Sequence, residues 1–308
     1  MSEATFRVLH AGPHVSVQDA GRPGMLRFGV PASGPMDRKS FAVAQAALGN
    51  PATASGIEVS LGGLGLHCES GSVSVAVAGA GFIVETGGQR GGSWATLTLR
   101  QGDTLTLRRG PWGSWTYLAF SGALLAGEWL GSCATHGASG LGGGNLHAGQ
   151  RLTVTAARVL DPPAGPIVCP VRARPRHLLR CVAGPQERFF DQDTRAVFAS
   201  SRFEVTDALD RMGLRLRGPS LVPQGALSIP SEPILRGSVQ VSGDGVATVL
   251  LADHQTTGGY PKIATVLADD LDGFVQCRPR DAVAFRVIPA DEAVAVARLA
   301  ALCTGPKS

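Results

Sequence analysis

The sequence predicts a mainly β protein with two domains and a few short helices. Three observations support this prediction. Short segments of alternating or β-branched character recur along the 308 residues, and each is bounded by Gly, Pro, Asp or Asn. The chain holds 41 glycines, which suit the tight turns between such strands. Helix signals are few, so we expect helices to be accessories to the sheets.

The predicted strands share a run of β-branched or alternating apolar residues between turn residues. They are residues 6–9, 57–61, 72–78, 95–99, 115–120, 151–155, 178–182, 203–206, 246–251, 263–267 and 282–287.

The clearest helix signal lies at residues 36–48. A Ser-Gly-Pro sequence precedes it, Phe41, Ala44 and Leu48 have helical apolar spacing, and Gly49 provides a stop. Residues 187–198 and 291–302 give the other two predicted helices.

A proline-rich stretch near the middle of the chain predicts a domain boundary. Residues 161–175 hold five prolines and little periodicity, which is typical of a linker. We therefore predict an N-terminal β-rich domain at residues 1–161, a linker at 162–175 and a C-terminal β-barrel domain at 176–308. The Gly-rich segment 131–149 is interpreted as a long loop of the first domain.

The composition excludes several classes of partner. The formal net charge is +4, and apart from a group of arginines at residues 172–180 the basic residues are scattered, which argues against nucleic acid binding. No signal peptide pattern is found at the N-terminus, and no apolar run approaches the ~20 residues that cross a bilayer. The six cysteines form no CxxC pair, as expected for reduced thiols. These features predict a soluble, cytoplasmic protein without a membrane partner.

Familiar cofactor motifs are missing. The sequence has no GxxxxGK[ST] loop, no GxGxxG after a strand, no HExxH, no His/Cys pair at zinc spacing and no GxSxG elbow. We therefore expect no metal ligands and no serine hydrolase triad. No lysine is flanked by methionines as in a biotin carrier, so biotin is not expected on this chain.

The densest polar segment is residues 253–262, which follow an apolar strand. Most of its side chains can form hydrogen bonds, and two adjacent glycines allow a close approach of the backbone to a ligand. The alternative is a hydrogen-bonded hairpin turn. We take its members as candidate substrate-binding residues: His254, Gln255, Thr256, Thr257, Gly258, Gly259 and Tyr260.

Lys262 closes this segment and is one of only three lysines in the chain. Its ammonium could hold a carboxylate or polarise a carbonyl oxygen, so we count it as a candidate catalytic residue. A lysine that faces solvent is the alternative.

A second polar cluster lies in the N-terminal part, where Arg22, Ser33 and Asp37 surround a predicted helix start that favours an anion. Asp37 could instead stabilise the first helical turn, and Arg22 could form a structural ion pair. Weaker candidates come from turns and strand ends: Asn50, Glu58, Arg211 and Glu232.

Taken together, these segments resemble the family of 5-oxoprolinase C-type subunits and allophanate hydrolase subunit 2, which is biotin-dependent carboxyltransferase-like. The matching stretches share order and spacing over nearly the whole chain. They lie at 17–24, 29–37, 49–51, 58 with 61–63, 117–119, 131–132 with 135, 184–186, 210–213, 231–232, 237–240 and 251–264. The run Gln-Thr-Thr-Gly-Gly-Tyr-Pro-Lys-Ile-Ala at 255–264 is the most specific.

The resemblance implies cyclophilin-like β-barrel subdomains. It also implies a partner chain, which is the B-type subunit of 5-oxoprolinase or allophanate hydrolase subunit 1, and a LamB-type protein as the further, A-type component. In the 5-oxoprolinase version, ATP with Mg²⁺ serves to phosphorylate the lactam oxygen. In urea carboxylase, the equivalent domain pair passes a carboxyl group from biotin, carried elsewhere, to urea.

The leading hypothesis is therefore ATP-dependent opening of 5-oxoproline to glutamate, within a heteromeric complex. Lys262, Arg22 and Arg211 would stabilise negative charge. The ring would be oriented by Gln255, Thr256, Thr257 and Tyr260. One carboxylate would act as general base: Asp37, Glu58 or Glu232.

Two alternatives remain open. One is biotin-dependent carboxyl transfer to urea or a related amide, and the other is a non-enzymatic regulator of the partner chain. The sequence has Trp115 and Cys133 where the family pattern has arginines, which gives the regulator weight.

Overall fold

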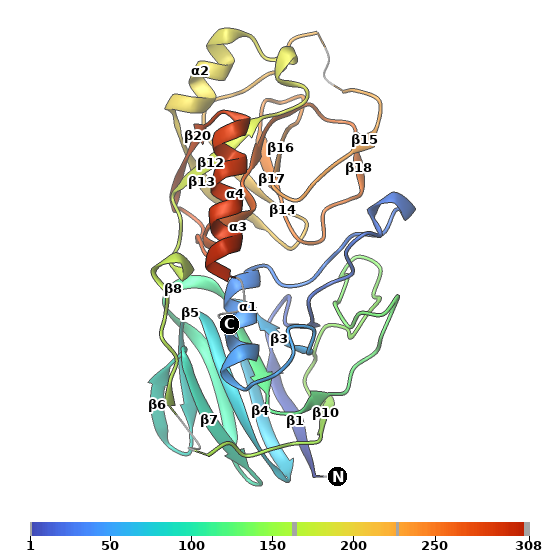
Figure 1. The fold of residues 1–308 in the computed structure, drawn as a ribbon, viewed down its shortest axis with the longest axis vertical. Helices are drawn as coiled ribbons and strands as arrows, with labels where there is room; N and C mark the ends of the chain where they lie inside the picture. Colours follow the sequence, from blue (N-terminus) through green and yellow to red (C-terminus); the bar gives the residue numbers. More distant parts are fainter. Residues whose placement is uncertain (1, 162–164, 226–227, 305–308) are drawn as a thin grey trace. The chain divides into compact units, whose positions relative to one another are not determined.

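The computed structural model describes residues 2–161, 165–225 and 228–304. Within these ranges the chain forms two compact units, the first made of residues 2–26 and 31–175 and the second of 27–30 and 176–304, each without the gaps just given. Both units are built mainly from strands, as predicted (Figure 1). None of the helices in the described ranges combines the length and the apolar character needed to cross a bilayer.

The first unit contains a sheet of eleven strands in the order β11-β7-β5-β8-β4-β1-β10-β9, to which β2, β3 and β6 add at the side. The strands are β1 (Glu3–Ala11), β2 (Ser16–Gln18), β3 (Gly56–Val59), β4 (Leu64–Ser70), β5 (Ser72–Thr86), β6 (Gln89–Gly92), β7 (Ala95–Arg100), β8 (Thr104–Phe120), β9 (Ala123–Leu124), β10 (Arg151–Thr155) and β11 (Gly165–Pro166). Short 3-10 turns lie at Leu26–Phe28 and Val171–Ala173. Of the predicted linker, residues 162–164 lie outside the described ranges.

The two longest strands, β5 and β8, pair antiparallel through the middle of this sheet. Their apolar side chains pack into a core with residues of β1 and β4, where the rings of Phe6 and Phe120 lie 5.5 Å apart. Helix α1 (Arg38–Ala47) packs on β5 and β8, and the ring of Phe41 meets Tyr117 edge-on at 5.5 Å. The predicted helix at 36–48 is confirmed.

The second unit is a closed barrel in the order β12-β19-β16-β17-β14-β13-β20. Its strands are β12 (Leu178–Ala183), β13 (Arg202–Leu209), β14 (Gly213–Arg217), β16 (Ser238–Val241), β17 (Ala247–Leu250), β19 (Lys262–Val266) and β20 (Ala282–Val287). A separate two-stranded sheet pairs β15 (Glu232–Pro233) with β18 (Thr257–Gly258). The barrel closes where β12 and β20 pair in parallel.

Three helices accompany this barrel: α2 (Gln192–Ser200), α3 (Ala268–Phe274) and α4 (Ala290–Thr304). The predicted helix at 187–198 is divided, because Glu187–Phe189 forms a 3-10 turn and Asp191 then caps α2 by accepting a hydrogen bond from the Thr194 N–H at 2.7 Å. The predicted helix at 291–302 corresponds to α4. All of the predicted strands overlap observed ones.

Candidate functional site

The candidate residues fall into two groups, one in each unit. The first unit holds Arg22, Ser33, Asp37, Asn50 and Glu58, and the second holds the residues from Arg211 onward.

Asp37 and Glu58 belong to one buried hydrogen-bond network. Asp37 caps α1, since its carboxylate accepts from the Ser40 N–H at 2.9 Å and from the Ser40 hydroxyl at 2.6 Å. The Asp37 N–H donates to the Tyr117 hydroxyl at 2.6 Å, and this hydroxyl donates to Glu58 Oε2 at 3.0 Å. The Met36 N–H donates to the same oxygen at 2.7 Å. Helix-start stabilisation, the alternative for Asp37, is therefore what the geometry shows.

Tyr117 is fully buried and lies near the carboxylates of Glu58 and Asp37. Burial is the largest cause that raises the pKa of its hydroxyl well above the usual value, and the charges of Glu58 and Asp37 raise it further. Tyr117 therefore stays protonated and serves as a donor to Glu58. This network holds the start of α1 on β3 and β8.

Arg22 lies buried against the loop that begins at residue 131. Its Nη2 donates to the carbonyl oxygens of Ser132 at 3.2 Å and Ala134 at 2.5 Å, and its guanidinium lies 5.0 Å from the centre of the Trp129 ring. Asp19 holds the same loop by accepting from the Ser132 hydroxyl and the Cys133 N–H, both at 2.6 Å. The contacts of Arg22 thus anchor this loop.

Ser33 combines two unusual features. It adopts a φ of +52°, which residues other than glycine rarely do, and it is buried. Its hydroxyl meets no hydrogen-bond partner among the described residues. Strained backbone and a buried polar group without a partner are concentrated at functional sites.

A cavity of about 720 Å³ opens in the first unit between the loops that carry Asp19 and Asn50. Asn50 donates through Nδ2 to Gln45 Oε1 at 2.7 Å and to the Phe120 carbonyl at 2.8 Å. Cys133 also lines the cavity, and burial is the main cause that raises the pKa of its thiol. The cavity has the size of a small-molecule site.

In the second unit, the 253–262 segment leaves β17, forms β18 and enters β19. Arg211 and Asp253 form a buried bidentate pair, with Nε and Nη2 donating to Oδ2 and Oδ1 at 2.9 and 3.0 Å. The His254 ring is also buried, and its Nδ1 lies 2.7 Å from the Gln255 carbonyl oxygen. Arg211 and His254 therefore fix the start of the segment.

The rest of the segment is more open. Thr257 and Tyr260 are among its exposed residues, while Gly258 is buried. A Cβ at Gly258 would lie 2.5 Å from Gln240 Nε2, so glycine fits best at this point. Gly258 thus allows β18 to lie close to the Gln240 side chain of β16.

Lys262 is the most unusual residue of this unit. Its side chain is 3% exposed, yet it ends in an ammonium that pairs with Glu232, with Nζ 3.5 Å from Oε2. No hydrogen-bond partner of Nζ lies among the described residues. The side chain of Glu232 is 45% exposed, so the pair connects a buried cation to the surface.

Two glutamine amides complete this cluster. Gln186 donates through Nε2 to Glu232 Oε2 at 2.5 Å and accepts from the Lys262 N–H through Oε1 at 3.3 Å. Gln240 is buried, and its Nε2 meets no partner among the described residues. We call this group of four residues the lysine cluster: Lys262, Glu232, Gln186 and Gln240. Gln240 and Lys262 stand opposite each other where β16 pairs with β19. A buried ammonium and a buried N–H donor on paired residues can bind an oxygen that carries negative charge.

Gln186 and Gln240 were not among the predicted site residues, nor was Tyr117. Both glutamines stand in stretches that carry the family resemblance, at 184–186 and 237–240, but nothing in the sequence indicates that they meet Lys262. The contacts arise only when β16 and β19 pair and residues 184–186 cross the start of β19.

Fold and site define a β-rich protein with a barrel unit that holds a buried lysine and a carboxylate. Residues 28–287 match the family described as carboxyltransferase domain, subdomain A and B, and the chain belongs to this family. It is 30% identical to the C-type subunit of 5-oxoprolinase from Haemophilus influenzae over 294 residues, which cover 94% of both chains.

Two larger proteins are also similar. Urea amidolyase of Lachancea kluyveri is 28% identical over 314 residues, which cover 91% of this chain and 17% of that protein. The crystal structure of the K. lactis urea amidolyase superposes with a TM-score of 0.85 at 24% identity, over 97% of this chain and 19% of that one. This last likeness supports the fold alone.

Proposed function

We propose that the chain is the C-type component of a cytoplasmic, ATP-dependent 5-oxoprolinase complex, and that the lysine cluster binds and polarises the lactam. The observation that carries this proposal is the buried Lys262 ammonium, which among the described residues faces one partly exposed carboxylate. The similarity to the C-type subunit of 5-oxoprolinase over almost the full length of both chains supports the choice of substrate.

The chemistry follows from what a lactam requires. Amide resonance makes the ring carbonyl a poor electrophile, and opening the ring adds one water across the C–N bond. The carbon gains the hydroxyl oxygen and the nitrogen gains a proton. Lys262 and the Gln240 amide would donate to the carbonyl oxygen and stabilise the charge that develops there. Glu232, oriented by Gln186, would accept the proton of the attacking water.

The lysine cluster fits one oxygen of a lactam or carboxylate, but it does not fit ATP with Mg²⁺. A triphosphate needs several cations and N–H groups, and the sequence has no Gly-rich phosphate loop. We therefore place ATP and Mg²⁺ on a partner, either the B-type chain or a LamB-type protein, and assign no step of the phosphate chemistry to these residues.

The test measures ATP-dependent release of glutamate from 5-oxoproline by the chain copurified with its partner chains. Lys262→Met keeps the apolar stem, so we expect an assembled complex with a turnover lower by about 10²–10³-fold. Glu232→Gln should lower turnover by about 10²–10⁴-fold, because it removes a general base. Lys39→Met is the matched control and should leave turnover unchanged.

An assembled wild-type complex without turnover would reject the proposal. If Lys262→Met also bound the partner normally in that case, the non-enzymatic regulator would be the better description.

The second candidate is transfer of a carboxyl group from biotin, carried by another chain, to urea or a related amide. The family description and the similarity to urea amidolyase favour it. Incorporation of labelled carboxylate into urea by the chain with a biotin carrier, without glutamate release from 5-oxoproline, would establish this reaction instead.

A further inference from the structure

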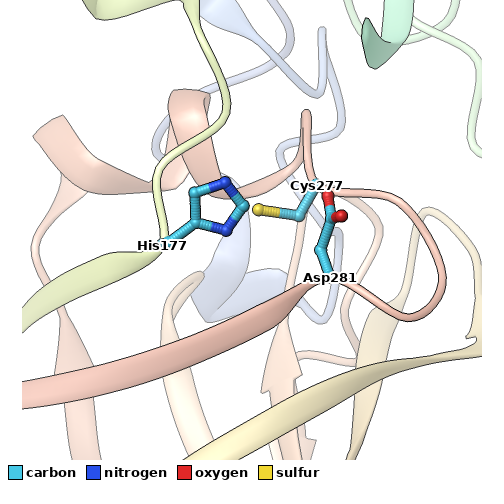
Figure 2. Close-up of side chains that lie close together, drawn as sticks. All are labelled: His177, Cys277 and Asp281. Carbon is cyan, nitrogen blue, oxygen red and sulfur yellow. The ribbon is translucent and has the colours of Figure 1, made fainter.

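A cluster of three potential metal ligands lies in the second unit, apart from the residues assigned above. His177 precedes β12, Cys277 follows α3, and Asp281 precedes β20. One ligand atom of each lies within 4.8 Å of those of the other two (Figure 2). Cys277 is buried, Asp281 is half-buried and His177 is exposed. A thiol, an imidazole and a carboxylate thus converge from three segments of the chain.

The backbone beneath the cluster is fixed by the closure of the barrel. β12 and β20 pair in parallel from Leu178 and Ala284 onward, and the Ala284 N–H donates to the His177 carbonyl oxygen at 2.8 Å. The cluster therefore lies at the first rungs of the seam between β12 and β20. A metal ion at this point would tie together the two strands that close the barrel.

His177 and Asp281 each make one hydrogen bond with one polar atom of the side chain, and the other polar atom can bind a metal. His177 Nδ1 lies 3.0 Å from the Ala282 carbonyl oxygen, so the tautomer with a proton on Nδ1 leaves the Nε2 lone pair for a metal. Asp281 Oδ2 accepts from the Arg278 N–H at 2.8 Å, and Oδ1 remains as a ligand. Such secondary contacts orient ligands in metal sites.

The local charge does not oppose a cation as strongly as the neighbouring arginines first imply. The Cys277 thiol donates to the carbonyl of Arg176 at 3.4 Å, but the guanidinium of Arg176 pairs with the buried Asp270 at 3.0 Å. Asp270 also pairs with Arg180 at 2.7 Å, so this carboxylate offsets the positive charge of Arg176 in part.

We propose that His177, Cys277 and Asp281 form a zinc-binding site with one open coordination position. The mixed set of sulfur, nitrogen and oxygen ligands suits Zn²⁺ and not Mg²⁺ or Ca²⁺, which prefer oxygen alone. Tetrahedral coordination with bonds of about 2.0–2.3 Å requires ligand atoms roughly 3.3–3.8 Å apart, so any pair that is farther apart within the 4.8 Å limit must move closer on binding. The exposed His177 ring can make this movement.

Binding exchanges a proton for the metal. Cysteine ligates zinc as the thiolate, so the thiol proton of Cys277 must leave when the metal binds. Zinc binding releases this proton, and the affinity therefore rises with pH. His177 is exposed, so a water from the solvent would serve as the fourth ligand.

The test uses the full chain after treatment with a chelator and titrates it with Zn²⁺ by calorimetry and with Co²⁺ by absorption. We expect one metal ion per chain and a thiolate-to-cobalt charge-transfer band. Cys277→Ser should abolish the band and weaken Zn²⁺ binding by more than about 100-fold. Cys169→Ser, a half-buried cysteine of the first unit, is the matched control and should change neither signal.

His177→Ala keeps the test decisive if Cys277→Ser fails to fold, because this side chain is exposed. It should weaken Zn²⁺ binding by about 10–100-fold and leave the thermal unfolding of the metal-free protein unchanged. A wild-type chain that binds no Zn²⁺ at micromolar concentrations, or binding that survives both substitutions, would overturn the proposal.

Discussion

Single residues in this protein show how burial decides what a charged group can do. Arg211 and Asp253 are both almost fully buried and satisfy each other in a bidentate pair. Lys262 is equally buried. Its ammonium lies 3.5 Å from one carboxylate oxygen of Glu232 and forms no hydrogen bond with the described residues. The first arrangement is a structural ion pair, whereas the second leaves donors for a ligand.

This contrast predicts that removal of Asp253 destabilises the barrel strongly. Asp253→Ala leaves the Arg211 guanidinium buried next to a cavity, so the free energy of unfolding should fall by about 3–5 kcal/mol. Urea denaturation followed by circular dichroism measures the change.

Glu204→Gln provides the comparison, since Glu204 pairs with Arg217 at 3.3 Å on the exposed face. An exposed pair contributes about 0–1 kcal/mol, so this variant should unfold nearly as the wild type does. Similar losses in both variants would show that burial does not set the contribution of the Arg211–Asp253 pair.

At the scale of elements, the position of the lysine cluster depends on how closely β19 approaches residues 184–186. A Cβ placed on Gly184 would lie 2.1 Å from the Lys262 carbonyl oxygen. Backbone atoms cannot yield as a flexible side chain does, so any larger residue must separate β12 from β19. The absence of a side chain at Gly184 therefore lets the backbone of Lys262, the first residue of β19, lie close to the end of β12.

Gly184→Ala should accordingly displace Lys262 and lower stability by about 1–3 kcal/mol, as overpacking does in dense interiors. We expect glutamate release by the assembled complex to fall together with thermal stability. Gly91→Ala is the control, since nothing lies within 4 Å of a Cβ there and its φ is not positive. An unchanged Lys262 environment in Gly184→Ala, measured by the rate of its chemical acetylation, would contradict this account.

Elements with a local signature could be predicted from the sequence, and elements that depend on tertiary contacts could not. The helix at α1 follows from its cap and apolar spacing, and β5 and β20 from their β-branched runs. Helix α3 was not predicted, because its N-cap residue is Leu267, whose side chain makes no capping hydrogen bond, and the helix is only 7 residues long.

The same distinction applies to the candidate site. Lys262 and Glu232 were recognised from their motifs, yet the contact of Lys262 with Gln186 joins residues 76 positions apart. The metal-ligand cluster was not expected from the sequence because no His/Cys pair has zinc spacing, whereas His177 and Cys277 meet only across the seam of β12 and β20. Spacing rules detect ligands on one turn or hairpin and not those that a closed barrel brings together.

At the scale of the whole molecule, both units bury acidic groups, a thiol in one and a tyrosine hydroxyl in the other, whose pKa values are raised by folding. Burial, and next the charge of Asp270, raise the pKa of the Cys181 thiol to about 12, and the pKa of Tyr117 in the first unit is raised well above its usual value. In the unfolded chain a thiol titrates near ~8.5 and a tyrosine near ~10. The folded state therefore keeps protons that the unfolded state releases.

The sign of the effect follows from these directions. A pKa raised on folding contributes stability that is complete below the unfolded value and is lost as the pH rises toward the folded value. Stability should thus fall from about pH 8.5 upward, by about 2 kcal/mol per buried thiol at pH 10. Urea denaturation at pH 7, about 8.5 and 10, with chelator present to keep metal from the thiols, measures this slope.

Cys181→Ala separates the contribution of one thiol from the rest. The variant should unfold more readily than the wild type at pH 7, because the substitution leaves a cavity in the barrel. It should nevertheless lose about 2 kcal/mol less between about pH 7 and 10, since the unfolded variant has one thiol fewer to release a proton. Equal slopes in the two proteins would mean that the buried thiol does not cause the alkaline sensitivity.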